Sequence, residues 1–160
     1  KIKQFDPSMK FAVFQQKLFY YKMNLISKNY PKWLGTRICV KKYLKSPQWL
    51  RELKFKKRPF WRIDKLRLNN ILTDGGWHFC NLKNAENLSY KYKNLCETND
   101  PYHFKEKINE KYLDTNKIQE NINKGKDLIG RDDTYQKIEI DNSYPDYFLK
   151  NINNYKDWIA

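Results

Sequence analysis

Hydrophobic and polar positions predict strands mainly in the first half of the chain and helices in the second. Residues 10–21 (KFAVFQQKLFYY) are rich in β-branched and aromatic side chains, which predicts a strand or a pair of strands. Because positions 11–14 are all apolar, both faces of this strand are expected to be covered. A turn marked by Pro31 and Gly35 precedes a second predicted strand over residues 36–44.

Capping residues indicate where the helices begin and end. Ser46 as a cap and Pro47 at the first helical position predict a short helix through about Leu53. After it, residues 72–74 lead into a Gly75-Gly76 turn. In the second half, the pattern predicts a helix over residues 85–96 capped by Asn84 and a helix begun by Asp114 or Thr115 and ended by Gly125. An edge strand is predicted over residues 136–140. Pro145 then opens a last helix, whose inward residues are Phe148, Leu149, Ile152 and Tyr155.

Composition limits the classes of protein to consider. A chain of 160 residues with 40% hydrophobic and 16% aromatic side chains can build one core, and it has too many aromatics for a disordered protein. No apolar run approaches the roughly 20 residues that span a bilayer, and no signal peptide is recognisable. Three cysteines without C-x-x-C spacing (Cys39, Cys80 and Cys96) argue against a disulfide scaffold or a structural zinc site and favour free thiols.

Positive charge is concentrated in the first half. The net charge is +14, and residues 1–80 hold 19 Lys and Arg against four Asp and Glu. Such a surface attracts polyanions, although a solvated basic face is an equally good interpretation. Aromatics among the basic residues leave a nucleic-acid-binding module as the alternative function, without a recognisable motif behind it. The densest part comprises Lys54, Lys56, Lys57, Arg58, Arg62, Lys65 and Arg67, interleaved with Phe55, Phe60 and Trp61.

The stretch Asp74-Gly75-Gly76-Trp77-His78-Phe79 is the most informative for chemistry. Adjacent glycines allow close backbone approach and a positive φ. An indole beside an imidazole provides a stacking surface next to a titratable hydrogen-bonding group. A tight turn followed by core residues is the competing interpretation.

In the order of its motifs the chain resembles the C-terminal half of glycosyltransferase family 17, the β-1,4-N-acetylglucosaminyltransferases. The resemblance covers nearly the whole chain, and DGGWHF is its most specific part. The segments that carry it are FQQKLFYYKMNL (14–25), WLGTR (33–37), SPQWLR (46–51), DGGWHF (74–79), GKDL with Arg131 (125–131), YPDYFLKN from residue 144 and YKDWI ending at residue 159.

The resemblance implies an α/β fold that is the C-terminal half of a GT-A-like nucleotide-sugar transferase domain. Residues 1–160 would then be a single partial domain, with the nucleotide-binding half and its acidic metal motif upstream. The implied reaction transfers N-acetylglucosamine from UDP-GlcNAc to a mannose-containing glycan with inversion. The expected partners are UDP-GlcNAc, the glycan acceptor and the upstream half, and not nucleic acid. We expect the 160 residues to be inactive alone.

The resemblance also suggests the site residues. Gly75 and Gly76 would shape it, His78 would face the diphosphate or a divalent metal (Mn or Mg), and Trp77 would pack on a sugar. Arg37 and Arg51 are candidates for phosphate binding or for a scaffold role, and Trp33 for the acceptor groove. Tyr20 and Tyr21 are further groove candidates, although core packing is the better interpretation; since adjacent strand residues face opposite ways, at most one would line a groove.

Some features depart from the family or are not assigned. The His that family members commonly carry at the end of the helix after the WHF motif is absent from Asn94-Leu95-Cys96-Glu97-Thr98-Asn99, where Glu97 is a candidate for part of its role. His103 is a displaced candidate, although a surface-loop His is the better interpretation. No catalytic base is assigned. The bacterial type of resemblance suggests the cytoplasm, or the periphery of a membrane at its inner face, whereas animal members of the family are Golgi membrane proteins.

Overall fold

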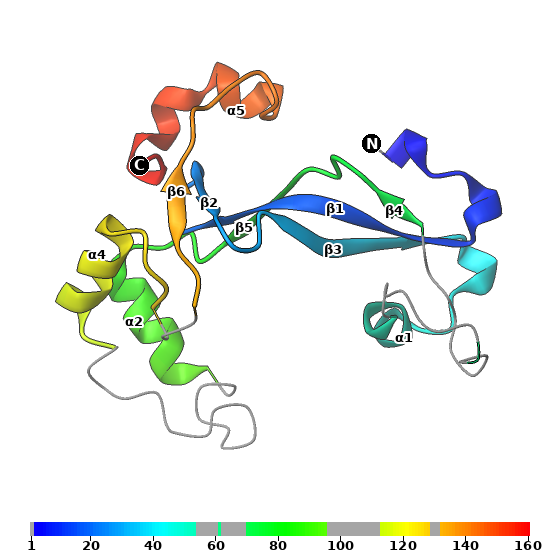
Figure 1. The fold of residues 1–160 in the computed structure, drawn as a ribbon, viewed down its shortest axis with the longest axis horizontal. Coiled ribbons are helices and arrows are strands. Elements are labelled where there is room, and N and C mark those ends of the chain that lie inside the picture. Colours follow the sequence, from blue (N-terminus) through cyan, green and yellow to red (C-terminus); the bar gives the residue numbers. More distant parts are fainter. Residues whose placement is uncertain (1, 54–60, 62–69, 96–112, 129–131) are drawn as a thin grey trace. The chain divides into compact units, whose positions relative to one another are not determined.

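The computed structural model describes residues 2–53, 61, 70–95, 113–128 and 132–160 (Figure 1). Two compact units make up the chain. Unit 1 comprises Lys1–Lys17 and Lys32–His78, and unit 2 comprises Leu18–Pro31 and Phe79–Ala160. In the described ranges, no helix has the length and apolar character needed to cross a membrane.

Strand β1 (Phe11–Tyr20) organises the strand pairing. It begins in unit 1 and ends in unit 2, and it pairs antiparallel with β3 (Lys32–Cys39) and with β2 (Leu25–Ser27). Two further partners are β4 (Ile71–Leu72), which runs parallel to it, and β5 (Trp77–Cys80). The predicted strand over residues 10–21 is thus confirmed as one long strand, and the mixed α/β class is confirmed with it.

Strand β3 corrects the predicted turn at Gly35. The strand begins at Lys32 and runs through this glycine, and it ends at Cys39, not at residue 44. Between the pairs Val13–Arg37 and Gln15–Leu34, β3 advances by three residues while β1 advances by two, which is a β-bulge. A Cβ at Gly35 would lie 2.4 Å from Gln16 Oε1, so the glycine permits a bulge where the sequence suggested a turn.

The first half of β1 is covered on both faces, as the pattern predicts. Positions 11–14 are all buried. On one face, Ala12, Phe14 and Leu72 form a buried cluster. Packed against it are Met9 of η2 (Pro7–Met9), Ile38 of β3 and Phe5, which follows η1 (Ile2–Gln4). On the other face, the Phe11 ring contacts the edges of Tyr43 in η3 (Lys41–Tyr43) and Trp49 in α1 (Pro47–Glu52).

Among the described residues, unit 2 has the larger buried cluster. Helices α2 (Ala85–Asn94) and α4 (Thr115–Asn123) lie side by side (Figure 1) and pack with β2 and β6 (Tyr135–Lys137). Isoleucines and leucines at helical spacing supply the buried face, as the sequence predicts. The buried cluster comprises Tyr21, Leu25, Ala85, Leu88, Ile118, Ile122, Leu128 and Tyr135.

The predicted helix caps Ser46 and Asn84 are confirmed, and of the two alternatives for the third helix, Asp114 and Thr115, the cap is Asp114. The side-chain oxygens of Ser46, Asn84 and Asp114 each accept a hydrogen bond from the backbone N–H three residues later, at 2.9–3.0 Å. Each cap satisfies one N–H group that the first helical turn cannot. Gly125, with φ at +61°, follows α4 as predicted.

Strand and helix lengths in unit 2 differ from the prediction. Strand β2 was not predicted, and β6 ends at Lys137 because its partner β2 is only three residues long. The edge position of β6 is confirmed. The last predicted helix is a short α5 (Asp146–Lys150) followed by the 3-10 helix η5 (Ile152–Trp158), with Phe148 buried and Leu149, Ile152 and Tyr155 half-buried.

Several candidate residues lie outside the described part of the chain. They are the basic residues from Lys54 to Arg67 with Phe55 and Phe60, the region Cys96-Glu97 with His103, and Arg131.

Candidate functional site

The centre of the candidate site is a stack of two aromatic rings within unit 1. Trp33 comes from β3 and His78 from β5, and their ring centroids are 5.4 Å apart with an interplanar angle of 21°. The Trp33 side chain is 43% exposed, and His78 is half-buried. The imidazole therefore lies at the surface against an indole and not deep among hydrocarbon side chains.

Gln16 of β1 connects the strands that carry the two rings. It stands opposite Trp33 in the strand register. Its Nε2 donates to the Trp77 carbonyl at 3.4 Å, and its Oε1 accepts from the Thr36 N–H at 3.2 Å. One amide thus ties β3 and the start of β5 to β1. Sequence reasoning missed Gln16, because only the pairing of distant segments gives it this role.

The two glycines before Trp77 have different roles. A Cβ on Gly75 would lie 2.5 Å from Phe14 Cβ, so this position requires glycine for close approach. Gly76 has open space around it but a φ of +104°, which only glycine adopts readily. Backbone hydrogen bonds join Gly75 N–H to the Gln15 carbonyl at 2.7 Å and Lys17 N–H to the Gly76 carbonyl at 2.9 Å. The expected close approach and positive φ are both confirmed.

Burial lowers the pKa of His78 below its usual value of 6.5. Removing water from around an imidazole disfavours the charged form, since the imidazolium loses more hydration than the neutral ring. The lowered pKa favours the neutral ring at pH 7. A neutral imidazole carries one N–H donor and one nitrogen acceptor, which suits it to bind a hydroxyl group.

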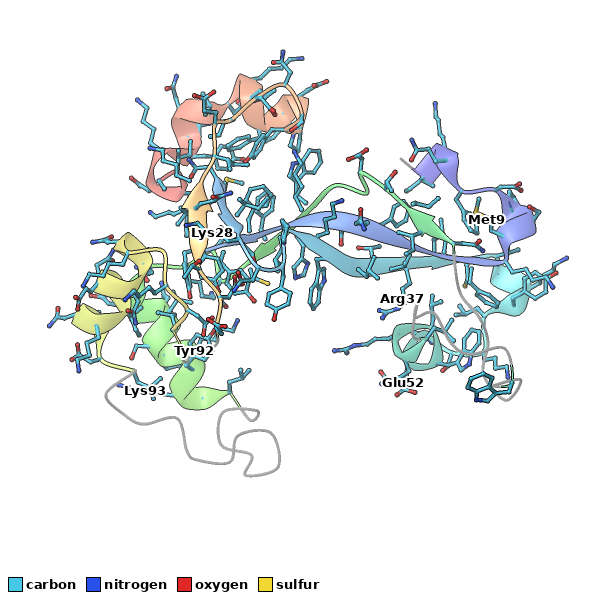
Figure 2. The ribbon with its side chains drawn as sticks, viewed as in Figure 1. Met9, Lys28, Arg37, Glu52, Tyr92 and Lys93 are labelled. Carbon is cyan, nitrogen blue, oxygen red and sulfur yellow. The ribbon has the colours of Figure 1, made fainter. Side chains whose placement is uncertain are left out.

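Arg37 and Arg51 are brought together, but apart from the ring stack. Arg37 lies between β3 and α1 (Figure 2), where its Nε donates to the Leu53 carbonyl at 3.3 Å and its Nη1 to the Gly35 carbonyl at 3.4 Å. Burial, and secondly the charge of Arg51, lower the pKa of Arg37. These bonds hold the end of α1 on β3, so the geometry favours a scaffold role for Arg37.

The strand register separates the arginines from the stack. Trp33 stands opposite Gln16, and Arg37 stands opposite Val13. Because successive residues of a strand face opposite sides, Gln16 and Val13 belong to different faces of β1. The seven residues proposed from sequence therefore do not form one site: Trp33, His78, Gly75 and Gly76 share a region with Trp77, whereas Arg37 and Arg51 belong to the α1 face.

The expected metal site is not formed by the residues that the structure describes. In that part of the chain, no group of three or more His, Cys, Asp and Glu side chains is arranged to hold an ion. The described neighbours of His78 thus do not fit a bound divalent metal, and a metal-ligand role for His78 stays a prediction from the family resemblance.

The two tyrosines considered for an acceptor groove belong to the unit 2 core. Tyr21 is 1% exposed and has a φ of +63°, which breaks the alternation of the strand. As a result both rings contact Tyr135, with Tyr20 stacked at 4.7 Å and Tyr21 edge-on at 5.2 Å. The expectation that the two side chains face opposite ways is wrong, and the preferred interpretation of core packing is confirmed for Tyr21.

Comparisons of the chain with protein-family models, with curated proteins and with solved structures find no match.

Proposed function

We propose that this chain is part of a glycosyltransferase that transfers N-acetylglucosamine from UDP-GlcNAc to a mannose-containing glycan with inversion. The observation that carries the proposal is the partly exposed Trp33 ring stacked on the neutral His78 beside a glycine turn. The identity of the donor and of the acceptor depends on the motif resemblance to glycosyltransferase family 17, with DGGWHF as its most specific part.

The stack suits a sugar because of what its two rings offer. A pyranose packs its C–H face on an aromatic ring while its hydroxyls require hydrogen-bonding partners around the edge. The Trp33 side chain, 43% exposed, provides the apolar contact. His78, held neutral, provides a donor or an acceptor at the same place. We assign this pair to the acceptor sugar.

Inverting transfer makes one bond and breaks another at the anomeric carbon. The acceptor hydroxyl forms the new C–O bond as its proton passes to a base, and the UDP oxygen leaves with the electron pair of the old bond. Positive charge stabilises the departing diphosphate. The described residues of this chain bind and orient the acceptor in this scheme; the base and the diphosphate contacts are not assigned to them, and no step is assigned to a metal ion.

Ligand binding to the chain labelled with 5-fluorotryptophan tests the proposal. The five tryptophans give separate ¹⁹F resonances, and Trp33→Phe identifies the signal of Trp33. We expect a trimannoside to shift the Trp33 resonance with a Kd of about 1 mM, typical of a single weak sugar contact. Trp33→Ala should weaken binding about fivefold, the effect of losing one aromatic contact.

Trp61→Ala is the matched control, because Trp61 is also an exposed indole of unit 1 and is not one of the two stacked rings. It should leave trimannoside binding unchanged. Equal losses in the two variants would remove Trp33 from the site. If neither the trimannoside nor UDP-GlcNAc shifted any tryptophan resonance, the glycosyltransferase proposal would be contradicted.

A further inference from the structure

A surface of lysines around an exposed leucine lies elsewhere in unit 1. It is independent of the ring stack and of the proposed glycosyl transfer. All four lysines are exposed, and Leu44 is 39% exposed between two of them in the sequence. This lysine–leucine surface comprises Lys10, Lys41, Lys42, Tyr43, Leu44, Lys45 and Trp49.

Hydrogen bonds and aromatic contacts fix the backbone that carries this surface. After β3, the Val40 N–H donates to the Lys10 carbonyl at 2.9 Å, and the Leu44 N–H donates to the Lys41 carbonyl at 3.0 Å. Tyr43 and Trp49 pack edge-on against the buried Phe11 ring, with centroids 6.0 and 5.4 Å away. The backbone that carries the lysines is therefore fixed by hydrogen bonds and by an aromatic cluster.

Lysine ammonium groups lie over the two half-buried rings. Lys10 and Lys42 place their Nζ atoms 5.3 and 4.9 Å from the Tyr43 centroid, and Lys45 places its Nζ 5.6 Å from the Trp49 ring. These cation–π contacts orient the charges and occupy ring faces. Rings that are packed below and capped by ammonium groups make poor stacking platforms for nucleic-acid bases.

Positive charge dominates the part of the chain that carries this surface. No Asp or Glu occurs between Asp6 and Glu52 in the sequence. Unit 1 contains 17 Lys and Arg against four Asp and Glu, a net charge of +13, whereas unit 2 contains 15 against 14, a net charge of +1. The partner that complements such a surface is an extended anionic one.

We propose that the lysine–leucine surface binds the anionic face of a phospholipid bilayer. Lysines are attracted to the surface potential of anionic lipids, and an exposed leucine among them can enter the acyl boundary. Tyr and Trp side chains favour the level of the headgroups. The exposed Leu44 and the two rings covered by lysines favour a bilayer over a nucleic acid. A nucleic acid has no apolar layer for Leu44 to enter, and its bases stack on aromatic faces that are uncovered.

Vesicle co-sedimentation of the 160-residue chain tests the proposal, with vesicles of phosphatidylcholine alone or mixed with phosphatidylglycerol. At about 0.1 M NaCl we expect binding to the anionic vesicles only, with loss at high salt as the charges are screened. The triple variant Lys41→Gln, Lys42→Gln, Lys45→Gln should bind about a hundredfold more weakly, since each lysine near an anionic surface contributes about fivefold.

A second triple variant is the matched control for total charge. Lys117, Lys150 and Lys156 are exposed lysines of unit 2, and changing them to Gln removes the same three charges. This variant should retain nearly all binding. Equal weakening by both triples would show that total charge and not this surface drives binding, which would overturn the proposal. Absence of binding to anionic vesicles would overturn it as well.

Leu44 distinguishes a bilayer from other polyanions. Leu44→Thr should weaken vesicle binding about threefold to tenfold through lost apolar contact. Ile71→Thr changes an apolar residue of similar exposure (41%) outside the surface and should have no effect. The opposite result has three parts: Leu44→Thr leaves vesicle binding unchanged, a single-stranded oligouridylate binds more tightly than vesicles, and the first triple variant loses the oligouridylate. In that case the surface would be a nucleic-acid site and the bilayer proposal would be wrong.

Discussion

The two units of this chain differ in what stabilises them and in what they expose. Among the described residues, unit 2 buries a cluster of eight and unit 1 a cluster of three on one face of β1; by sequence, unit 2 is nearly neutral and unit 1 carries a net charge of +13. All seven residues proposed for the site from sequence, as well as the lysine–leucine surface, belong to unit 1. Like charges repel one another in a compact state, so unit 1 combines weaker apolar packing with stronger repulsion.

This contrast suggests a division of roles. Unit 2 supplies stability through ordinary apolar burial, and a buried polar pair lies within it, where the Asp133 carboxylate accepts from the Ser27 hydroxyl at 2.8 and 3.0 Å. Unit 1 instead presents a partly exposed indole, a neutral imidazole and lysines at its surface. Residues that serve binding are commonly kept at some cost in stability.

The largest expected effect comes from the unit 2 core. Leu88 is fully buried in the cluster of eight, so Leu88→Ala should lower the free energy of unfolding by about 3–5 kcal/mol, while Leu72→Ala in the smaller cluster should cost about 2 kcal/mol. Urea denaturation measures both values. Tyr90→Ala, at a 72% exposed position of the same helix as Leu88, is the control and should change little.

Hydrogen exchange sharpens this comparison. Leu88→Ala should speed exchange chiefly in α2 and α4, and Leu72→Ala chiefly in β3 and β4. If the two leucine variants cost the same and accelerated exchange everywhere alike, the two units would unfold as one body with a shared core, and the contrast drawn between them would fail.

A smaller effect is expected at the glycine turn of unit 1. Gly75→Ala places a methyl group 2.5 Å from Phe14 Cβ and must displace the turn from β1, at a cost of about 2–3 kcal/mol. Gly76→Ala meets no atom and should cost only about 1 kcal/mol through its φ of +104°. Thermal unfolding ranks the two variants.

The same pair of variants also reports on the site. The ¹⁹F resonance of Trp33 should move more in Gly75→Ala than in Gly76→Ala, because the displaced turn carries His78 away from the indole. The opposite ranking, in stability or in the resonance, would mean that the turn does not hold the ring stack in place.

The smallest expected effect is a pH dependence from His78. The pKa of His78 in the folded protein lies below its value of 6.5 in the unfolded chain. Above pH 6.5 the imidazole is neutral in both states, so protonation costs the folded protein no stability there. As the pH falls through the folded pKa, the unfolded state takes up the proton first and stability decreases. His78→Phe keeps a ring against Trp33 and removes the titration, so its melting temperature should fall less between pH 7.5 and pH 5 than that of the unchanged chain. An identical fall in both would show that the imidazole does not lose hydration on folding.

Local signals in the sequence predicted much of the fold. Ser46 and Asn84 were recognisable as caps, and the third cap was narrowed to Asp114 or Thr115, because a capping side chain bonds to a backbone group only three residues away. The inward face of α4 followed from Ile118 and Ile122 at helical spacing. Each of these features depends on neighbours within one or two turns of the chain.

Features that depend on distant segments were predicted poorly. Gly35 suggested a turn, and its place in a bulge depends on Gln16 in the partner strand. Tyr20 and Tyr21 were expected to diverge, and both contact Tyr135. The short β2 carries too few residues for a pattern, and it exists because β1 and β6 pair with it.

For the candidate site, the sequence alone determined which residue types are available: the glycine pair, the indole and imidazole after it, and the excess of positive charge in the first half. Only the tertiary structure decided that His78 stacks on Trp33, 45 positions earlier in the chain, and that Arg37 belongs to the opposite face of β1. Strand pairing between distant segments, together with the extra residue of the bulge, determines which side chains share a face. Neither can be predicted from the residues adjacent in sequence, because both depend on which distant strand becomes the partner.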